Sequence, residues 1–484
     1  MKKVSDILAD CKILETIGGG KIFQGKICFD SRQVEEGDMF IAVKGSQVDG
    51  HDYIANTISL GASHIVCEQI PNEVNENICY IKLDDTRSGL GKISSAFFEN
   101  PSKDLKLVGI TGTNGKTTIA SLLFDVSRFL GFSAGLISTI KICINDQELP
   151  ATHTTPDPIQ LNASLKKMLN AGCEYVFMEV SSHAIDQDRI AGLKFKGGVF
   201  TNLSHDHLDY HKDFATYRDV KKRFFDELGS DSFALINKDD KNGSFMIQNT
   251  IADVHEYSLK SDSEYKVAVK EMHLEGNLLQ IDGEEVWTSL PGEFNAYNVV
   301  SVIATGHLLG FNYRELLEAV SIQKSAAGRF EIFSSAKGSI AIVDYAHTPD
   351  ALENVLKTIR AISDGNKRII TIVGAGGDRD KLKRPLMAKI AASLSDKLIL
   401  TSDNPRSENP EQIIEEMKKG LDNDLIKKMV SIINRDEAIK ITCSLAEKSD
   451  VILLAGKGHE NYQEIDGVKH HFDDREKIKE YLNS

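Results

Sequence analysis

The sequence has no long hydrophobic run, and no stretch approaches the roughly 20 apolar residues that a membrane-spanning helix needs. Its first residues, MKKVSDILADCKIL, start with a basic pair, but Asp6, Asp10 and Lys12 interrupt any apolar core of a signal peptide. Positive charge is in deficit, because 71 acidic residues against 57 Lys and Arg give a formal net charge of −14. This excess argues against nucleic acid or an anionic membrane surface as the main partner.

The cysteines lack any pairing pattern. The chain has 7 of them and no CxxC pair, at Cys11, Cys28, Cys67, Cys79, Cys143, Cys173 and Cys443. An odd, unpatterned set of thiols fits a reducing compartment. We therefore expect a cytoplasmic protein with no membrane partner. Internal repeats and low-complexity tracts are also missing.

What the sequence does have is a series of apolar, β-branched runs that end in polar or glycine-rich loops. Examples are LKLVGITGTNG, YVFMEVSSH, GGVFTNLSHDH, FALINKDD, IAIVDYAHTPD, RIITIVGAGGDRD, KLILTSDNP and VILLAGKGHE. Helical patterns lie between them, which predicts parallel α/β sheets whose strands are buried on both faces. Ligands of such sheets bind at the carboxyl ends of the strands, so these loops should hold the chemistry.

The length predicts more than one core. At about 150 residues per domain, 484 residues correspond to roughly three domains. We place them at residues 1–103, 104–330 and 331–484, with the first boundary near PSKDLK and the second near SAAGRF.

The stretch GITGTNGKTT (109–118) lies between an expected strand and an apolar helix, TIASLLFDVSRFLG. Backbone N–H groups of such a loop cradle phosphates, Lys116 neutralises them, and the Thr117 hydroxyl can reach magnesium. The general P-loop pattern would have glycine where this chain has Ile110. A chance glycine-rich turn is the alternative, and the GKTT ending between strand and helix disfavours it.

Two further side chains could serve a hard cation beside these phosphates. Glu179 ends the strand YVFMEVSSH, and His207 lies in SHDHLDYH after another strand of the same expected sheet. A lone Glu or His is usually structural. Because both follow strands that neighbour the glycine-rich loop, we expect a role with magnesium.

Lys221 falls on the apolar stripe of an expected helix, which runs through Phe214, Tyr217, Phe224 and Leu228. Lys222 lies about 100° away around the same helix. The ordinary interpretation is a lysine that snorkels to solvent. A desolvated lysine, however, has a depressed pKa, and its neutral amine can add carbon dioxide to become a carbamate. That carbamate would be another oxygen ligand for magnesium.

The NKDD segment (237–240) matches the guanine-reading motif NKxD and also ends a strand, which raises the alternative of a GTP-binding switch. The candidate DxxG motif of such a switch, DELG (226–229), sits at a helix end rather than at a strand end. A third domain with its own polar loops is also superfluous in a switch. We therefore favour an enzyme.

The stretch TSDNPRSENP places an arginine in a strand-to-helix loop. Asn409 suits the cap and Pro410 the first turn of the helix that follows, so Arg406 precedes a helix start, a site that favours anions. Its planar guanidinium suits a carboxylate bidentately. The alternative is a surface pair with Glu408 or Glu411.

These motifs together resemble the Mur ligases of peptidoglycan synthesis over nearly the whole chain. They occur in the order TGTNGKTT, MEVSSHAIDQDR, TNLSHDHLDYH, GEFNAYN, GRFE, DYAHTPD, GGDRDKLKRP and GKGHE. DYAHTPD combined with DNPR and GKGHE resembles specifically the members that make the UDP-N-acetylmuramoyl-tripeptide. Within the family NKDD corresponds to a common INxDD stretch, which weakens the GTP alternative. His205 is a departure, since a relative has Arg in SRDHLDYH.

The resemblance implies roles for individual residues. The ATP phosphates would be bound by Gly112, Thr113, Asn114, Gly115, Lys116, Thr117 and Thr118, and the rest of the nucleotide by Asn298, Arg329 and His347. Magnesium would be held by Thr117, Glu179, His207 and carbamylated Lys221, the last three acting in catalysis with Lys116. The uridine-diphosphate sugar would contact Ser31, Ser46, Gln47 and Val48. The muramoyl-dipeptide would contact Thr154, Thr155, Ser181, Gln187 and Arg189. The incoming amino acid would contact Arg379, Asp403, Asn404, Pro405, Arg406, Gly456 and Glu460.

The implied fold is α/β in three domains: a small UDP-binding domain, a central P-loop ATPase domain with a parallel sheet, and a Rossmann-like third domain. The implied reaction uses ATP to join meso-diaminopimelate to the D-glutamate γ-carboxylate of UDP-MurNAc-L-Ala-D-Glu through an acyl phosphate. L-lysine or another diamino acid is the alternative. Lysine lacks one carboxylate of diaminopimelate, which Arg406 is predicted to read. We expect a monomer with no nucleic-acid partner.

Overall fold

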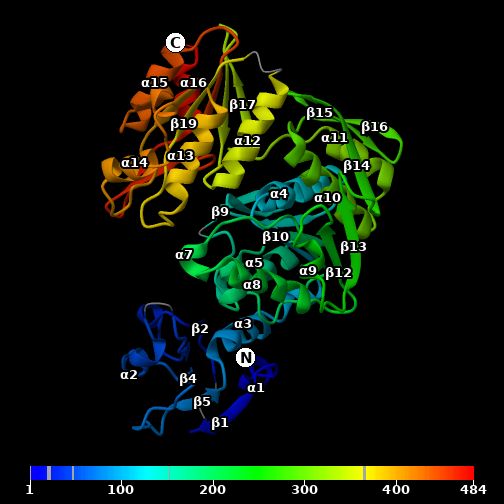
Figure 1. The fold of residues 1–484 in the computed structure, drawn as a ribbon. Helices are drawn as coiled ribbons and strands as arrows, with labels where there is room; N and C mark the ends of the chain where they lie inside the picture. The colour runs from blue at the N-terminus through cyan, green and yellow to red at the C-terminus, as the bar shows by residue number, and fades with distance from the viewer. Residues whose placement is uncertain (1, 19–22, 46–47, 152, 364–366, 484) are drawn as a thin grey trace.

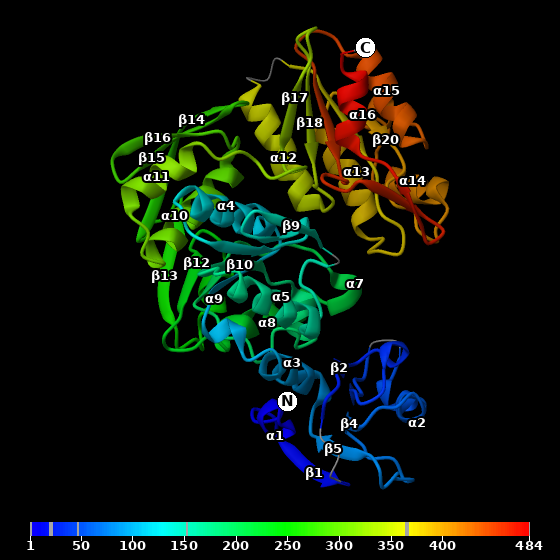
Figure 2. The ribbon, with the colours of Figure 1, turned by 180° about the vertical axis from the view of Figure 1, so that it is seen from behind.

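The computed structural model describes residues 2–18, 23–45, 48–151, 153–363 and 367–483. The chain forms three α/β units in sequence order, each built around one main sheet (Figure 1). The first unit, in blue, lies at one end of the molecule, and the third, in yellow to red, lies at the other (Figures 1 and 2). No helix in these described ranges is both long and apolar enough to cross a membrane.

The first unit has a five-stranded sheet in the order β1-β5-β4-β3-β2. Its strands are β1 (Ile13–Ile17), β2 (Ile27–Cys28), β3 (Met39–Ile41), β4 (His64–Cys67) and β5 (Cys79–Leu83). All neighbours pair in parallel except β1, which is antiparallel to β5. Its helices are α1 (Val4–Ile7), α2 (Ile54–Ser59) and α3 (Thr86–Phe97). α3 packs on the central unit, where the Ser95 hydroxyl donates to the Gly192 carbonyl oxygen at 3.1 Å.

The central unit has an eleven-stranded sheet in the order β16-β15-β14-β13-β12-β11-β6-β10-β7-β8-β9. Its strands are β6 (Lys106–Thr111), β7 (Ala134–Ile137), β8 (Lys141–Ile144), β9 (Gln147–Pro150), β10 (Tyr175–Glu179), β11 (Gly197–Phe200), β12 (Phe233–Asn237), β13 (Asp253–Ser258), β14 (Tyr265–His273), β15 (Gly276–Ile281) and β16 (Glu284–Thr288). Strands from β7 to β14 in this order pair in parallel, as expected from their apolar runs.

Both edges of this sheet are antiparallel, so the sheet is mixed rather than purely parallel. The turn from β15 to β16 consists of Asp282 and Gly283, whose φ values are 50° and 86°. Positive φ at both positions is what a tight hairpin turn with the right-handed strand twist requires. A two-residue connection cannot lead to a parallel neighbour, so these strands return antiparallel.

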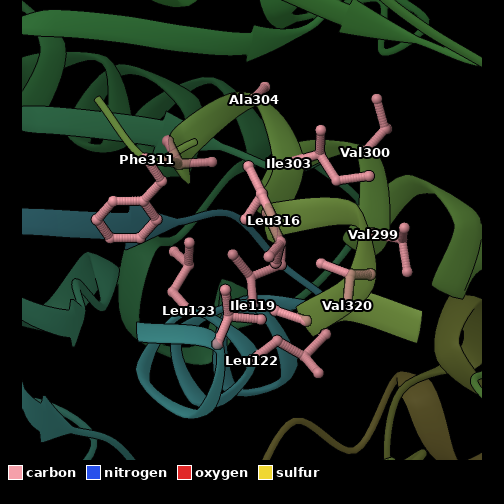
Figure 3. Close-up of a cluster of buried hydrophobic side chains, with 14 of the residues drawn as sticks. Ile119, Leu122, Leu123, Val299, Val300, Ile303, Ala304, Phe311, Leu316 and Val320 are labelled. Atoms are coloured by element: carbon pink, nitrogen blue, oxygen red, sulfur yellow. The ribbon is translucent and has the colours of Figure 1, made fainter. Parts of the chain in front are cut away.

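Helices cover both faces of the central sheet. They are α4 (Lys116–Phe129), α5 (Pro158–Asn170), α6 (Ser182–Asp186), α7 (Leu208–His211), α8 (Phe214–Asp226), α9 (Gly243–Met246), α10 (Glu293–Leu308) and α11 (Tyr313–Ser321). On one face Ile119 and Leu123 of α4 meet Ile303 of α10 and Leu316 of α11 (Figure 3). α5 and α8 form a second apolar cluster with the sheet. The P-loop helix α4 is thus held inside the core.

The third unit has a six-stranded sheet in the order β17-β18-β22-β19-β20-β21, parallel except for β17. Its strands are β17 (Glu331–Ser334), β18 (Ile340–Asp344), β19 (Ile369–Val373), β20 (Lys397–Leu400), β21 (Met429–Ser431) and β22 (Val451–Ala455), followed by the hairpin β23 (Tyr462–Ile465) and β24 (Val468–His471). Its helices are α12 (Pro349–Ile362), α13 (Lys383–Leu394), α14 (Pro410–Lys418), α15 (Arg435–Leu445) and α16 (Asp474–Tyr481).

The third unit has the two-sided architecture predicted for it. Residues of α12, α13 and α14 pack in one apolar cluster of this unit, and residues of α15 and α16 pack in another. α14 begins at Pro410, and the Asn409 side chain accepts the Glu411 N–H at 2.8 Å, which confirms the predicted helix start. The predicted domain boundaries at 103/104 and 330/331 stay predictions.

Candidate active site

The loop between β6 and α4 can pass close to other segments of the protein because two of its residues are glycine. Gly112 has a φ of 148°, and a Cβ there would lie 1.9 Å from Thr201 Oγ1. Gly115 has a φ of 89°, and a Cβ there would lie 2.7 Å from Asn298 Oδ1. A side chain at either position would collide or be strained. The loop leads into the N-terminus of α4, where backbone N–H groups favour an anion.

Lys116 is the first residue of α4, and its side chain folds back over this loop. Its Nζ donates to the carbonyl oxygens of Gly112 at 2.9 Å and Thr113 at 2.8 Å. Burial lowers the pKa of Lys116. Neutral carbonyls are weaker partners for an ammonium than phosphate oxygens are. The arrangement therefore fits a loop that binds phosphates.

Lys221 lies within α8, and only 1% of its surface is exposed. Its Nζ donates to the Gly112 carbonyl oxygen at 2.9 Å and lies 4.9 Å from the ring centroid of Tyr217. Burial, and less strongly the nearby Lys116 ammonium, lower the pKa of Lys221 well below its usual value. The snorkelling interpretation is therefore wrong. This environment favours a neutral amine, the form that can add carbon dioxide.

Lys222, which the helical pattern placed off the apolar stripe, is buried as well, with 7% of its surface exposed. Its Nζ pairs with the Asp226 carboxylate at 2.5 Å and lies 5.9 Å from the ring centroid of Phe245. The reason is tertiary, because α9 packs against α8 and covers this side. The two neighbouring lysines therefore have different surroundings, one at the P-loop and one in an ion pair.

Glu179, at the end of β10, is 1% exposed, and its charge interacts with the Lys116 ammonium. Its carboxylate accepts the Thr139 N–H at 2.7 Å and the Thr139 hydroxyl at 3.2 Å. His207 has a φ of 55°, and its Nε2 lies 3.4 Å from Asp206 Oδ2. Within the described ranges, no three His, Cys, Asp or Glu side chains form a metal-binding group by themselves. The buried Glu179 carboxylate nevertheless supplies the oxygen ligands that a hard metal ion prefers, and it lines the same cavity as Thr117.

One cavity of about 650 Å³ brings together most of the residues predicted to act on ATP. Its lining includes Thr113, Asn114, Gly115, Lys116, Thr117, Thr118, Thr154, Glu179, Ser181, His207, Lys221, Asn298, Arg329 and His347. Thr155, Gln187 and Arg189 are not in this lining. They form a chain of hydrogen bonds to it. The Arg189 guanidinium donates to Gln187 Oε1 at 2.7 Å and to the Thr155 carbonyl oxygen at 2.8 Å, and the Thr155 hydroxyl donates to the Glu179 carbonyl oxygen at 2.8 Å.

Residues of the third unit, together with Arg329 at the end of the central unit, close one side of this cavity. Asn114 Nδ2 donates to Asp350 Oδ2 at 2.7 Å, and Arg329 Nη2 donates to Thr117 Oγ1 at 3.0 Å. The Arg329 guanidinium also lies 4.5 Å from the ring centroid of Tyr345. Burial lowers the pKa of His347 to about 4, so its ring is neutral at pH 7. Residues from two units thus surround the P-loop.

Several lining residues were missed by sequence reasoning. Asp350 lies in the first turn of α12, within the DYAHTPD motif, and its place at a helix start directly after a strand was a usable signal. Asp206 stood beside His207 in SHDH and could have been chosen for the same reason. Thr139 gave no signal, because an isolated threonine after a strand is common. Only the fold brings it to Glu179.

The central and third units also come into contact at His205, the position at which this sequence differs from a relative. Its Nε2 lies 3.5 Å from Asp380 Oδ2 of the third unit. Arg379, next to Asp380, is exposed, and its Nη1 donates to the Asp378 carbonyl oxygen at 3.2 Å. His205 therefore sits at an interface between units rather than in the lining of the cavity.

The DNPR loop lies beyond the end of β20. Asp403 and Asn404 are buried, and Asn404 Nδ2 donates to Glu460 Oε2 at 2.8 Å. A Cβ on Gly456 would lie 2.7 Å from Asp403 Oδ2, so β22 and β20 end close together here. Tyr345, which lines the ATP cavity, has its hydroxyl 3.5 Å from Glu460 Oε1. The predicted amino-acid site thus adjoins the cavity through one shared side chain.

Arg406 pairs with neither Glu408 nor Glu411, so the alternative of a surface pair with one of these two residues is wrong. Its Nε lies 3.3 Å from Glu464 Oε2, and its Nη1 donates to the Gly377 carbonyl oxygen at 2.8 Å. Glu408 instead pairs with Arg384 at 2.9 Å. Glu464 was missed because it lies on the β23–β24 hairpin, far along the chain.

Of the residues predicted for the UDP-sugar, Ser31 and Val48 lie in the first unit and outside the lining of the ATP cavity. Ser31 begins a 3₁₀ turn capped by Asp30, and Val48 is 55% exposed. Ser46 and Gln47 lie outside the described residues. Their role in binding stays a prediction.

The two carboxylates of NKDD accept hydrogen bonds from backbone N–H groups of nearby loops. Asp239 accepts the backbone N–H groups of residues 259–261 at 2.8, 2.9 and 2.9 Å. Asp240 accepts the Leu203 N–H at 2.9 Å. These hydrogen bonds hold loops at the ends of β11, β12 and β13. They give the motif a structural role and disfavour a guanine-reading one.

A phosphate-binding loop facing a buried lysine, closed over by a separate α/β unit, defines an ATP-using enzyme of three domains. The chain belongs to the Mur ligase family, whose members are ATP-dependent, amide-bond-forming ligases. Residues 26–98 match the model described as the Mur ligase family, catalytic domain, residues 110–306 the Mur ligase middle domain, and residues 328–458 the Mur ligase, glutamate ligase domain. The predicted family and fold class are confirmed, and the GTP-switch alternative is set aside.

Relatives similar over their full length carry one name, UDP-N-acetylmuramoyl-L-alanyl-D-glutamate–2,6-diaminopimelate ligase. The protein of that name from Bacteroides thetaiotaomicron is 52% identical over 99% of this chain and 100% of its own length. The one from Clostridioides difficile is 39% identical over 99% of each chain. A solved structure with this name is 32% identical, covers 94% of both chains and has a TM-score of 0.66.

Proposed function

We propose that this protein uses ATP to join meso-diaminopimelate to the D-glutamate γ-carboxylate of UDP-MurNAc-L-Ala-D-Glu. The observation that carries the proposal is the meeting of Lys116, Lys221 and Glu179 in one cavity that adjoins the DNPR loop through Tyr345. At the phosphate-binding loop ATP would activate the substrate carboxylate, and the adjoining amino-acid site would hold the amine that attacks it. The names of the full-length relatives support this choice of substrates.

The first step transfers the γ-phosphoryl group of ATP to the γ-carboxylate. The bond between the γ-phosphorus and ADP breaks as the carboxylate oxygen bonds to phosphorus, which gives an acyl phosphate. Lys116 is placed to exchange its loop carbonyls for phosphate oxygens. Such chemistry depends on positioning and on electrostatic stabilisation rather than on covalent participation of the protein.

Lys221 takes part as its carbamate. The neutral Nζ attacks carbon dioxide, a C–N bond forms, and a proton leaves to solvent. This step converts a buried cation-forming group beside the P-loop into an anionic oxygen donor. The carbamate, Thr117, Glu179 and His207 are the residues that would hold magnesium. Bound magnesium would neutralise charge on the phosphate oxygens.

In the second step the neutral amine of the incoming amino acid attacks the acyl carbon, the bond from that carbon to the phosphate oxygen breaks, and the nitrogen gives up a proton as phosphate leaves. Water must be kept from the acyl phosphate until then. The contacts of Asn114 with Asp350 and of Arg329 with Thr117 close the cavity toward the third unit. Arg406 offers a charged, half-buried donor set for the distal carboxylate of diaminopimelate, which L-lysine lacks. This favours diaminopimelate over the lysine alternative.

The test is phosphate release from ATP in the presence of UDP-MurNAc-L-Ala-D-Glu and meso-diaminopimelate, L-lysine or L-ornithine. We expect release that needs both the nucleotide-sugar and an amino acid, with strong preference for meso-diaminopimelate. Omission of each substrate in turn is the control. Release with none of the three amino acids would overturn the proposal.

A further inference from the structure

The β23–β24 hairpin straps the DNPR loop along its length. Gln463 Nε2 donates to the Asp403 carbonyl oxygen at 2.6 Å, and the Glu464 N–H donates to Asn404 Oδ1 at 3.0 Å. The Arg406 N–H donates to the Glu464 carbonyl oxygen at 3.0 Å, and the Asp466 N–H donates to the Arg406 carbonyl oxygen at 2.8 Å. The two backbone bonds make one isolated parallel bridge between Arg406 and Ile465, and the two bonds that involve side chains extend the contact back to residue 403.

Arg406 needs such support, because its backbone has a φ of 52°. This left-handed conformation is unfavourable for a residue with a long side chain and persists where surrounding bonds determine it. The two hydrogen bonds on either side of Arg406 supply that restraint. The hairpin thereby decides where the arginine leaves the backbone.

The side chain of Arg406 is held at two of its three nitrogens. Nε faces Glu464 Oε2 at 3.3 Å, and Nη1 donates to the Gly377 carbonyl oxygen at 2.8 Å. Nη2 has no hydrogen-bond partner within the described part of the chain. The two side chains are 19% and 25% exposed, so the pair is only partly screened by water. A guanidinium is planar, and two fixed nitrogens fix the direction of the third.

We propose that Glu464 is a positioning residue for amino-acid selection. It holds the Arg406 guanidinium by Nε so that Nη2 and the free side of Nη1 face the distal carboxylate of the incoming amino acid. This inference rests on the proposed function and adds to it a residue outside the DNPR and GKGHE motifs. Preorganisation of this kind lowers the cost of ordering a long side chain when the ligand binds.

The opposite role is competition, in which Glu464 occupies Arg406 and the substrate must displace it. The two roles predict opposite changes in KM when the carboxylate is removed. If Glu464 positions Arg406, its removal raises KM for the substrate that Arg406 binds. If Glu464 competes with that substrate, its removal lowers KM. The occupied nitrogen is Nε and the unpartnered one is Nη2, which favours positioning.

The experiment measures phosphate release by the full-length enzyme for Glu464→Ala and Glu464→Gln, with meso-diaminopimelate and with L-lysine. For Glu464→Ala we expect KM for meso-diaminopimelate to rise roughly tenfold, because the half-buried ion pair that orients Arg406 is lost. Its kcat and its kcat/KM for L-lysine should not change. Glu464→Gln keeps a side chain of the same length with an oxygen near Nε but loses the charge of the ion pair, so it should recover only part of the loss.

Lys469→Ala is the matched control. Lys469 faces Glu464 across the hairpin, so its removal disturbs the same strands without removing a partner of Arg406. It should keep the wild-type KM, and all three variants should keep the wild-type melting temperature. An unchanged or lowered KM in Glu464→Ala, or equal losses on both amino acids, would overturn the inference. A wild type inactive with meso-diaminopimelate would overturn the proposed function itself, which is a different result.

Discussion

Lys221 offers the most direct test of the proposed chemistry. Two variants separate the amine from its packing: Lys221→Met keeps a long apolar chain without nitrogen, and Lys221→Ala leaves space beside the P-loop. Because the carbamate would sit among the phosphate-binding groups, we expect either change to lower kcat by about 10²–10³-fold, the usual cost of removing one preorganised electrostatic group.

The structure also sets the stability cost of these changes. Lys221→Ala removes three buried methylene groups, worth about 0.8 kcal/mol each and so about 2.4 kcal/mol in all. The Gly112 carbonyl oxygen loses the Lys221 donor but keeps its bond from Lys116 Nζ at 2.9 Å, and the buried Thr111 hydroxyl loses a long contact with Lys221 Nζ at 3.5 Å. Lys221→Met avoids most of the methylene loss. Both proteins should therefore fold, and their activity can be compared.

The assay is phosphate release with all substrates saturating, with and without short carboxylic acids such as acetate or propionate. A carboxylate can enter the space in Lys221→Ala and replace the carbamate, but it has no room in Lys221→Met. We expect rescue of the first variant only. Lys222→Ala is the control: loss of its ion pair with Asp226 should lower stability by about 1–3 kcal/mol and leave kcat unchanged. A Lys221→Met protein as active as wild type would refute the carbamate.

Three further predictions concern other parts of the molecule. Arg406→Ala should lower kcat/KM for meso-diaminopimelate by roughly 10- to 100-fold without creating efficient use of L-lysine; comparable kcat/KM values of the wild type on the two amino acids would show that Arg406 reads something else. Deletion of residues 1–84, which spares α3 on its central-unit neighbour α5, should abolish UDP-sugar binding and retain nucleotide binding in calorimetry; retained UDP-sugar binding contradicts the assignment. Burial raises the pKa of Asp344 from 3.8 to about 6, so its stabilising protonated form is lost as pH rises through that range. Asp344→Asn should therefore gain stability over wild type between pH 4 and pH 6 to at most about 3 kcal/mol, at about 1.36 kcal/mol per pKa unit, and a pH-independent difference in denaturant midpoint would contradict this.

The features that local sequence determined are those whose causes lie within a few residues. The glycine-rich loop, its strand and its helix follow from GITGTNGKTT. The turn needs residues without a Cβ where its backbone passes close to other segments of the protein. The start of α14 follows from Asn409 and Pro410. Helical spacing placed Lys221 on the stripe of Phe214, Tyr217, Phe224 and Leu228, but it left snorkelling to solvent open, and only the packing of α8 in the structure shows that this lysine is buried.

Other features depended on contacts between distant parts of the chain. Lys222 is buried because α9 returns over α8, although its own helix pattern leaves it off the stripe. Asp350 reaches Asn114 over 236 residues, and Glu464 reaches Arg406 from a hairpin that follows the last strand of the main sheet. No local periodicity encodes such pairs. The sequence by itself therefore determined which loops carry the chemistry, and the tertiary structure decided which side chains from different units meet there, because burial and electrostatic pairing depend on what packs against each loop.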